Sequence, residues 1–351
     1  MSLKKWMDSY SIWAFAFGYF ACYVPYSLTT KLLTKGLIPG SEGDAVSGFA
    51  ILPLSAVAAA LAMLVFVSAM RWWKYANHTK IMGFNIPRPG RWTLLSGVCA
   101  AATVGTTTLA YTFEGVSIVF AMLLMRGGVL ILAPIVDAIS GRKVRWFAWM
   151  GLAMSMSALL VSLSDTTSYA MPLLCGIDIA VYLASYFVRL RFMSRLAKSK
   201  EGDANKRYFV EEQMVATPTL AAVLVVVALV GSGDVVQALR DGFTAFWGQP
   251  LVIAIIIVGV LSQGTGVFGN LIYLDRRENT YCVPVNRSSS ILAGVVASYL
   301  LLLFPGQHAP GTTQLIGAGL IIAAIGFLTI PPMIANRRNR KLAASESTSA
   351  A

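Results

Sequence analysis

The sequence predicts an all-α integral membrane protein with ten transmembrane helices. Hydrophobic residues make up 56% of the chain and charged residues only 13%, whereas a soluble domain carries about 25% charged residues. Ten apolar segments approach the length of about 20 residues that a spanning helix needs. Basic residues gather in alternate loops between these segments, as they do in proteins that cross the bilayer several times.

The ten predicted spans occupy nearly all of the 351 residues. The first span follows Lys4 and Lys5 and lacks a small-residue cleavage site, so we expect it to stay in the protein rather than be removed as a signal peptide. Residues 336–351 are basic and then rich in Ser and Ala, which predicts a disordered cytoplasmic tail. The spans run at about 11–33, 48–70, 93–113, 115–136, 146–164, 171–190, 209–231, 250–274, 280–304 and 314–334.

Positive charge predicts the orientation of the chain. Of the 28 Lys and Arg residues, 23 lie before the first span, in every second loop, or after the last span. The opposite loops hold only Lys35 and Arg240. Since positively charged loops stay in the cytoplasm, both termini should lie inside. The net charge of +12 is then a consequence of topology and does not indicate a nucleic-acid partner.

The chain reads as two copies of a five-helix unit, residues 1–165 and 169–335. In each half the fourth span follows the third across a very short link and carries an arginine, Arg126 in the first half and Arg287 in the second. Because five is an odd number, the second copy must enter the membrane from the other side. Such an inverted repeat predicts a solute site near the midplane, between the halves, and alternating access to it.

Polar stripes at helical spacing run along the first, third, fourth, sixth, eighth and ninth spans. Unpaired polar groups are costly in lipid, so these six faces should point at one another or at water. Tyrosines, threonines and small residues also pack helices together, but six stripes in one chain favour a polar cavity. The remaining four spans are almost wholly apolar and would face lipid. The stripe residues predicted to line a binding site are Tyr26, Thr107, Tyr111, Arg126, Asp178, Tyr182, Gln263, Asn270, Tyr273, Asn286 and Arg287.

Arg126 and Arg287 carry the strongest functional signal. A guanidinium deep in a span costs at least about 2.5 kcal/mol on insertion scales, so something must offset it. Asp178, the only carboxylate deep in a predicted span, could pair with one arginine or serve as a protonatable coupling group. It cannot neutralise both, and an anionic solute would supply the missing charge, since the arginine fork matches carboxylate or phosphate. The other interpretation is structural, with both arginines bonded to backbone carbonyls or facing water. Glu211 and Glu212 are expected at a helix start, which carboxylates stabilise.

This pattern resembles the drug/metabolite transporter superfamily, in particular its EamA-like ten-helix members. The resemblance covers residues 8–335, and the segments 115–151 and 279–317 look like the family's paired fourth and fifth helices. It implies a cavity lined by spans one, three, four, six, eight and nine. The family's small multidrug exporters use a glutamate in the first helix, which is absent here, so export of organic cations is disfavoured. Relatives that exchange phosphorylated sugars use basic residues similar in kind to Arg126 and Arg287.

The leading hypothesis is a secondary transporter of a small organic or phosphorylated anion, working by alternating access in a bacterial inner membrane. A carrier of amino acids or neutral metabolites and a flippase for a lipid-linked phosphate are the alternatives within transport. A receptor or scaffold is the alternative outside it. An enzyme is not expected, because the predicted spans contain no His, no paired Asp at helical spacing and no Gly-x-Ser-x-Gly motif. The predicted partners are the solute and membrane lipids; the sequence indicates no cofactor or metal, and it does not specify an oligomeric state.

Overall fold

The computed structural model describes residues 12–38, 45–81, 84–110, 118–164, 173–199, 202–304 and 312–349. Each of the ten predicted spans is an α-helix there, with ends within a few residues of the predicted ones, except at the start of α8 and the end of α12. The helices are α2 (Ile12–Thr34), α3 (Gly48–Ala69), α4 (Arg91–Leu109), α5 (Ile118–Ile139), α6 (Trp146–Leu163), α7 (Leu173–Phe192), α8 (Ala204–Val230), α9 (Asp234–Thr244), α10 (Leu251–Tyr273), α11 (Asn279–Leu301) and α12 (Thr312–Ser349).

Four helices are long and apolar enough to cross a membrane, judged over the described residues. They are α3, α8, α10, and α7 together with a π-helical turn, η3 (Met193–Ala197), that continues it. Large apolar side chains stand exposed on their outer faces, among them Val65 at 67% and Leu173 at 81%. In water, contiguous apolar surface of this kind would be a liability. The helices therefore fit an integral membrane protein.

Two elements were not expected from the sequence. A two-stranded antiparallel hairpin, β1 (Asn77–Ile81) and β2 (Phe84–Arg88), follows a short 3-10 helix, η1 (Trp72–Tyr75), after α3. The all-α prediction is wrong in this detail, because strands of five residues are too short for their alternation to stand out within a polar loop. The short helix α9 packs on α3, where Leu239 clusters with Ala56 and Gly242 lies against the backbone of Ala50.

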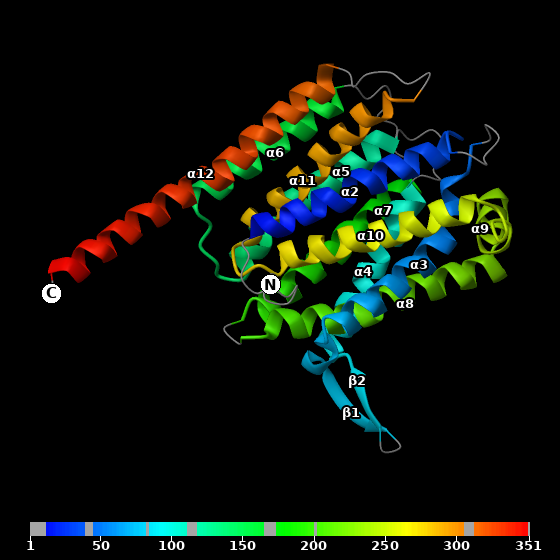
Figure 1. Cartoon of the computed structure of the whole chain (residues 1–351), viewed down its shortest axis with the longest axis horizontal. Helices are drawn as coiled ribbons and strands as arrows, with labels where there is room; N and C mark the ends of the chain where they lie inside the picture. Colours follow the sequence, from blue (N-terminus) through cyan, green and yellow to red (C-terminus); the bar gives the residue numbers. More distant parts are fainter. Residues whose placement is uncertain are drawn as a thin grey trace.

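The C-terminal segment differs from the predicted disordered tail. Helix α12 continues without a break to Ser349, and Figure 1 shows its last part projecting beyond the other helices. Residues 337–344 consist mainly of Arg, Lys, Leu and Ala, which are strong helix formers. Extending an existing helix avoids the cost of nucleation, so this segment can continue α12 without packing against the bundle.

Helices from the two halves of the chain pack against each other throughout the bundle. Helix α2 lies along α10 and α11, while α4 lies along α7 and α8. Helices α6 and α12 form a pair on one side, and α3 and α8 lie on the opposite side (Figure 1). A Cβ atom at Gly18 of α2 would lie 2.6 Å from the ring of Phe268 in α10. Glycine therefore permits the close approach of these two helices.

Candidate functional site

A cavity of about 760 Å³ lies between the two halves of the bundle. All six helices that correspond to the striped spans contribute to its wall: α2, α4, α5, α7, α10 and α11. The structure thus brings together side chains from positions 26 to 287. The predicted site residues in the wall are Tyr26, Thr107, Arg126, Tyr182, Gln263, Asn270, Tyr273, Asn286 and Arg287.

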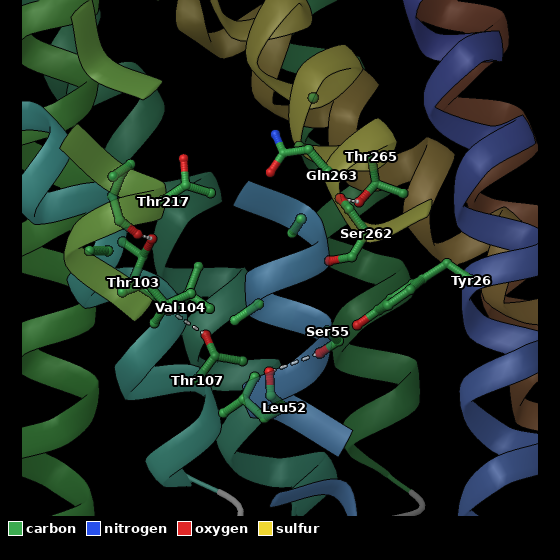
Figure 2. Close-up of a pocket in the computed structure, with 18 of the residues that line it drawn as sticks. Tyr26, Leu52, Ser55, Thr103, Val104, Thr107, Thr217, Ser262, Gln263 and Thr265 are labelled. Atoms are coloured by element: carbon green, nitrogen blue, oxygen red, sulfur yellow. Dashed lines mark hydrogen bonds between the residues drawn. The ribbon is translucent and has the colours of Figure 1, made fainter. Parts of the chain in front are cut away.

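Helices α3 and α8 also line the cavity, which corrects the expectation that they only face lipid. Ser55 of α3 and Gln213 and Thr217 of α8 lie in the wall, and Figure 2 shows Ser55 and Thr217 directed into the same space as Tyr26 and Gln263. A few small polar residues within otherwise apolar segments mark this contribution. The mean hydropathy of the whole segment does not reveal these few residues.

The hydroxyl groups of the wall are arranged as hydrogen-bond acceptors. Ser55 donates to the carbonyl of Leu52, and Thr107 donates to that of Thr103 (Figure 2). Thr217 and Thr265 likewise donate to carbonyls of their own helices. A hydroxyl has one proton, so each of these groups has only lone pairs left for a solute or water. Donors can come from the amide, guanidinium and tyrosine hydroxyl groups of the wall.

Arg287 is a buried donor in the wall of the cavity. Its side chain belongs to a residue that is 8% exposed, and one terminal nitrogen lies 3.4 Å from the hydroxyl of Tyr182. Its guanidinium carbon lies 5.4 Å from the ring centre of Tyr186, and its Nε has no hydrogen-bond partner. Asn286 beside it accepts a 2.9 Å hydrogen bond from the hydroxyl of Tyr273. Arg287 is thus surrounded by tyrosines rather than by carboxylates.

Arg126 reaches the same cavity from α5 and is half-buried. Within the described ranges neither Arg126 nor Arg287 forms a salt bridge. Two guanidiniums therefore share one cavity without a carboxylate of the described chain to neutralise them. This arrangement attracts an anion, because arginine forks bind carboxylate and phosphate oxygens in pairs.

The predicted pairing of Asp178 with an arginine is not found. Asp178 is 5% exposed and does not line the cavity, and neither of its carboxylate oxygens has a hydrogen-bond partner. It lies four residues before Tyr182, about 6 Å further along the axis of α7. The stripe on α7 therefore extends beyond the cavity, and only its later part lines the wall. Tyr111, the remaining predicted site residue, lies outside the described residues.

An ion pair between Arg189 and Glu212 was missed at the sequence level. Both residues are buried, and Arg189 also donates to the side-chain oxygen of Asn270. Helix α8 begins at Ala204, so Glu212 lies more than two turns inside it, and the expected role at a helix start is wrong. The spacing of Tyr182, Ser185 and Arg189 was the available signal, because it places Arg189 on the cavity side of α7 rather than in a loop.

Contacts between the halves close one end of the cavity. This basic end of the bundle comprises the link between α5 and α6, η3 with the start of α8, and the link between α10 and α11. The carboxylate of Asp137, at the end of α5, accepts hydrogen bonds from the backbone and side chains of Asn279 and Thr280, all between 2.7 and 2.9 Å. A buried carboxylate of the first half thereby caps the first turn of α11 in the second half.

Three basic residues extend this closure. Arg145 binds Glu278 through two hydrogen bonds of 2.9 and 3.1 Å. Arg142 donates to the carbonyls of Arg276 and Ser194, and Lys198 donates to the side chain of Asn279. Arg142 and Arg145 thus bridge the halves at the basic end, while Lys198 joins the end of η3 to the first turn of α11 within the second half.

A second pocket of about 630 Å³ lies at the basic end itself. On α10 the first cavity reaches Tyr273, whereas Leu271 and Leu274 line the second pocket. The two spaces therefore approach each other within about one turn of α10. At its other end the first cavity reaches Ser47 and Gly48, which are exposed at the start of α3. The wall of the first cavity therefore reaches exposed residues at this end of the bundle.

Comparisons with known proteins support the fold but add no function. No protein-family model matches the chain, and no curated protein matches it. One crystal structure, that of a protein without a stated function, is similar to it with a TM-score of 0.54 and 14% sequence identity. The similarity covers 90% of this chain and 96% of the other. At this identity the likeness shows a shared fold alone, so the family resemblance stays a prediction.

Proposed function

We propose that this protein is a ten-span membrane transporter that carries a small organic or phosphorylated anion by alternating access between two inverted five-helix halves. The observation that carries the proposal is the pair Arg126 and Arg287, which share one cavity without a carboxylate partner among the described residues. A buried charge without a partner is costly. A bound anion would offset that cost, so the site is suited to bind one.

The pattern of helix contacts supports the inverted repeat. If the halves are α2 to α6 and α7, α8, α10, α11 and α12, then α2 corresponds to α7 and α3 to α8. The contact of α2 with α10 then matches that of α7 with α4. The contacts of α3 with α10 and of α2 with α11 match those of α8 with α4 and of α7 with α5. Such matching is expected when the same unit occurs twice around a two-fold axis.

The two spaces on α10 support alternating access. With the positively charged loops in the cytoplasm, the basic end faces inward and the described state is open to the outside. The polar contacts of Asp137 lie at this end, where Leu271 and Leu274 line the inner pocket. Rocking of one half against the other would break these contacts, join the two spaces and close the outer end near Ser47.

Transport by purified protein in proteoliposomes tests the proposal. A panel of carboxylates and phosphate monoesters is first screened for thermal stabilisation, since a ligand that binds the folded state raises its stability by mass action. Counterflow of each stabilising anion is then compared between the unmodified protein and the Arg126→Ala and Arg287→Ala variants. We expect both variants to lose most of the flux, whereas Lys143→Ala, which removes an exposed charge outside the cavity, should keep it.

The same assay discriminates between the alternatives. Competition by neutral metabolites as strong as that by anions would indicate an amino-acid or neutral-solute carrier. Activity only with a lipid-linked phosphate would indicate a flippase. If neither arginine substitution changes the flux of any transported anion, the proposal is contradicted. Binding of an anion without any counterflow would indicate a receptor.

A further inference from the structure

The hairpin of β1 and β2 is the one described element that leaves the helical bundle sideways. Figure 1 shows it projecting from the region between α3 and α4, across rather than along the direction of α3 and α8. Its strands pair in a register that places Thr79 opposite Ile86 and Lys80 opposite Asn85. A segment that follows a spanning helix and then turns sideways stays near the level at which that helix ends.

A buried carboxylate holds the base of the hairpin in place. Glu211 of α8 is 2% exposed and accepts hydrogen bonds of 3.0 Å from the backbone amides of Asn77 and Gly90, at the two ends of the hairpin. It also accepts a 2.6 Å hydrogen bond from the hydroxyl of Thr93. Hydrogen bonds to an ionised acceptor are among the stronger ones in proteins. The hairpin is therefore positioned by the bundle rather than loosely tethered to it.

The two faces of the hairpin differ in chemistry. Successive side chains of a strand point to opposite faces, so Phe84, Ile86 and Arg88 share one face with Thr79, while Asn85 shares the other with Lys80. Phe84 is 74% exposed and Ile86 is 43% exposed. One face thus carries two exposed apolar side chains followed by Arg88, and the other carries the polar side chains of Asn85 and Lys80.

The surrounding charge and aromatic residues indicate what covers the apolar face. Residues 71–92 contain five Lys or Arg and no Asp or Glu. Tryptophans at both ends of this stretch, Trp73 and Trp92, are half-buried and exposed respectively, and Trp is typical of the boundary between lipid and water. Basic residues next to exposed apolar side chains are the combination that binds segments to the surface of an anionic membrane.

We propose that this hairpin binds the anionic lipid surface of the cytoplasmic leaflet, with Phe84 and Ile86 inserted among the headgroups, Arg88 on the same face contacting lipid phosphates, and Lys80 on the other face adding to the positive charge of the hairpin. The proposal rests on the inward orientation of the basic end given under the proposed function, but not on transport itself. A second copy of the chain fits less well. Two apolar side chains form only a small patch, whereas specific interfaces bury at least about 1,000 Å². Five positive charges on each copy would also repel one another.

The difference between the two faces provides the test. In a chain whose four cysteines are replaced by alanine, Phe84→Cys and Asn85→Cys are each labelled with an environment-sensitive fluorophore and reconstituted into nanodiscs. In discs of phosphatidylcholine with phosphatidylglycerol, the label at 84 should be quenched by nitroxide lipids and shielded from aqueous iodide several-fold more than the label at 85. In phosphatidylcholine alone the difference should shrink, and Lys80→Glu with Arg88→Glu should shrink it in the anionic discs.

Equal access of iodide to both labels in anionic discs overturns the proposal. Shielding at 84 that depends on having two protein molecules in each disc overturns it in favour of a second copy. Thermal unfolding of each labelled variant shows whether the fold is retained, and both substituted positions are exposed, so folding should not be affected. The labels report the contact between the hairpin and lipid without any solute. A negative transport result would therefore leave this test valid, and a negative result with the labels would not contradict transport.

Discussion

Arg189 and Glu212 form a buried ion pair in which the Nε and one terminal nitrogen of the arginine each lie 2.9 Å from a carboxylate oxygen. The pair joins α7 to α8 beside the cavity, and Asn270 of α10 completes it. Arg189 is thereby neutralised within the protein. Arg126 and Arg287 also line the cavity but form no salt bridge among the described residues. The proposed anion site is therefore assigned to these two arginines.

Glu212→Gln should destabilise the protein by about 3 kcal/mol, because removing one partner of a buried pair leaves an uncompensated charge. Thermal unfolding in detergent measures the effect. Arg145→Gln is the matched comparison, since it breaks an ion pair whose arginine side chain is 45% exposed and exposed pairs contribute at most about 1 kcal/mol. The double variant Arg189→Met with Glu212→Leu should recover most of the stability. A Glu212→Gln loss no larger than that of Arg145→Gln would show that the pair is not needed.

Asp137→Asn should loosen the closure at the basic end. The substituted amide can accept through one oxygen only, and its NH₂ group would face the backbone amide or hydroxyl of Thr280. Each hydrogen bond to a charged group contributes about 1.5–3 kcal/mol. A shift of 1.4 kcal/mol changes a population about tenfold.

Cys282 provides a native probe for this change, because it is fully buried in the first turn of α11. Its modification by an impermeant maleimide, followed site by site with mass spectrometry, should be at least about tenfold faster in Asp137→Asn, in line with that population shift. Asp241→Asn, at an exposed position on α9, should leave the rate unchanged. Equal rates in the two variants would mean that Asp137 does not hold the closure.

Gly259→Ala and Gly319→Ala should change stability in opposite directions. A Cβ atom at Gly259 of α10 would meet the carbonyl oxygen of Ser55 in α3 and lie 2.7 Å from the Cβ of Ala58. Overpacking of this kind costs about 1–3 kcal/mol. Nothing lies within 4 Å of the corresponding position at Gly319, which is exposed on α12. Alanine should there stabilise the helix by up to about 1 kcal/mol. Detergent melting curves that move the same way for both would contradict the packing of α3 on α10.

Asp178→Asn should raise the melting temperature without reducing anion flux. The carboxylate is buried, has no hydrogen-bond partner and does not line the cavity. Replacing it with a neutral amide of similar size removes the cost of burying an unpaired charged group, which exceeds the about 1–3 kcal/mol that an unpaired neutral amide itself costs. Flux lost at unchanged stability would instead identify Asp178 as a group whose protonation is coupled to transport.

The ten helices could be predicted from the sequence because bilayer thickness and backbone hydrogen bonding leave a spanning segment little choice. Long apolar segments in lipid must form helices to satisfy their amide groups. The cavity-facing sides of α2, α7 and α10 could also be predicted, because Tyr26, Tyr182 and Gln263 each belong to a set of polar residues at helical spacing. Helices α3 and α8 were assigned to lipid incorrectly, because isolated residues such as Ser55 and Thr217 do not form a stripe.

Contacts between residues distant in sequence could not be predicted in this way. Nothing near Glu211 indicates that it binds the backbone at Asn77 and Gly90, more than 100 residues away. Asp137 likewise meets Thr280 only after α5 and α11 have packed. Each carboxylate has several basic or polar groups available along the chain, and their pairing depends on which helix faces come together.

The order of residues alone determined the number and position of the apolar helices, the sign of charge at each loop, and the presence of two arginines in the interior. These follow from transfer energies and periodicity, which are local properties of a segment. The tertiary structure decided that Arg189 is neutralised by Glu212, that Asp178 stands apart from the cavity, and that Arg126 and Arg287 reach one space. Those outcomes depend on distances between helices, which packing sets and no single segment contains.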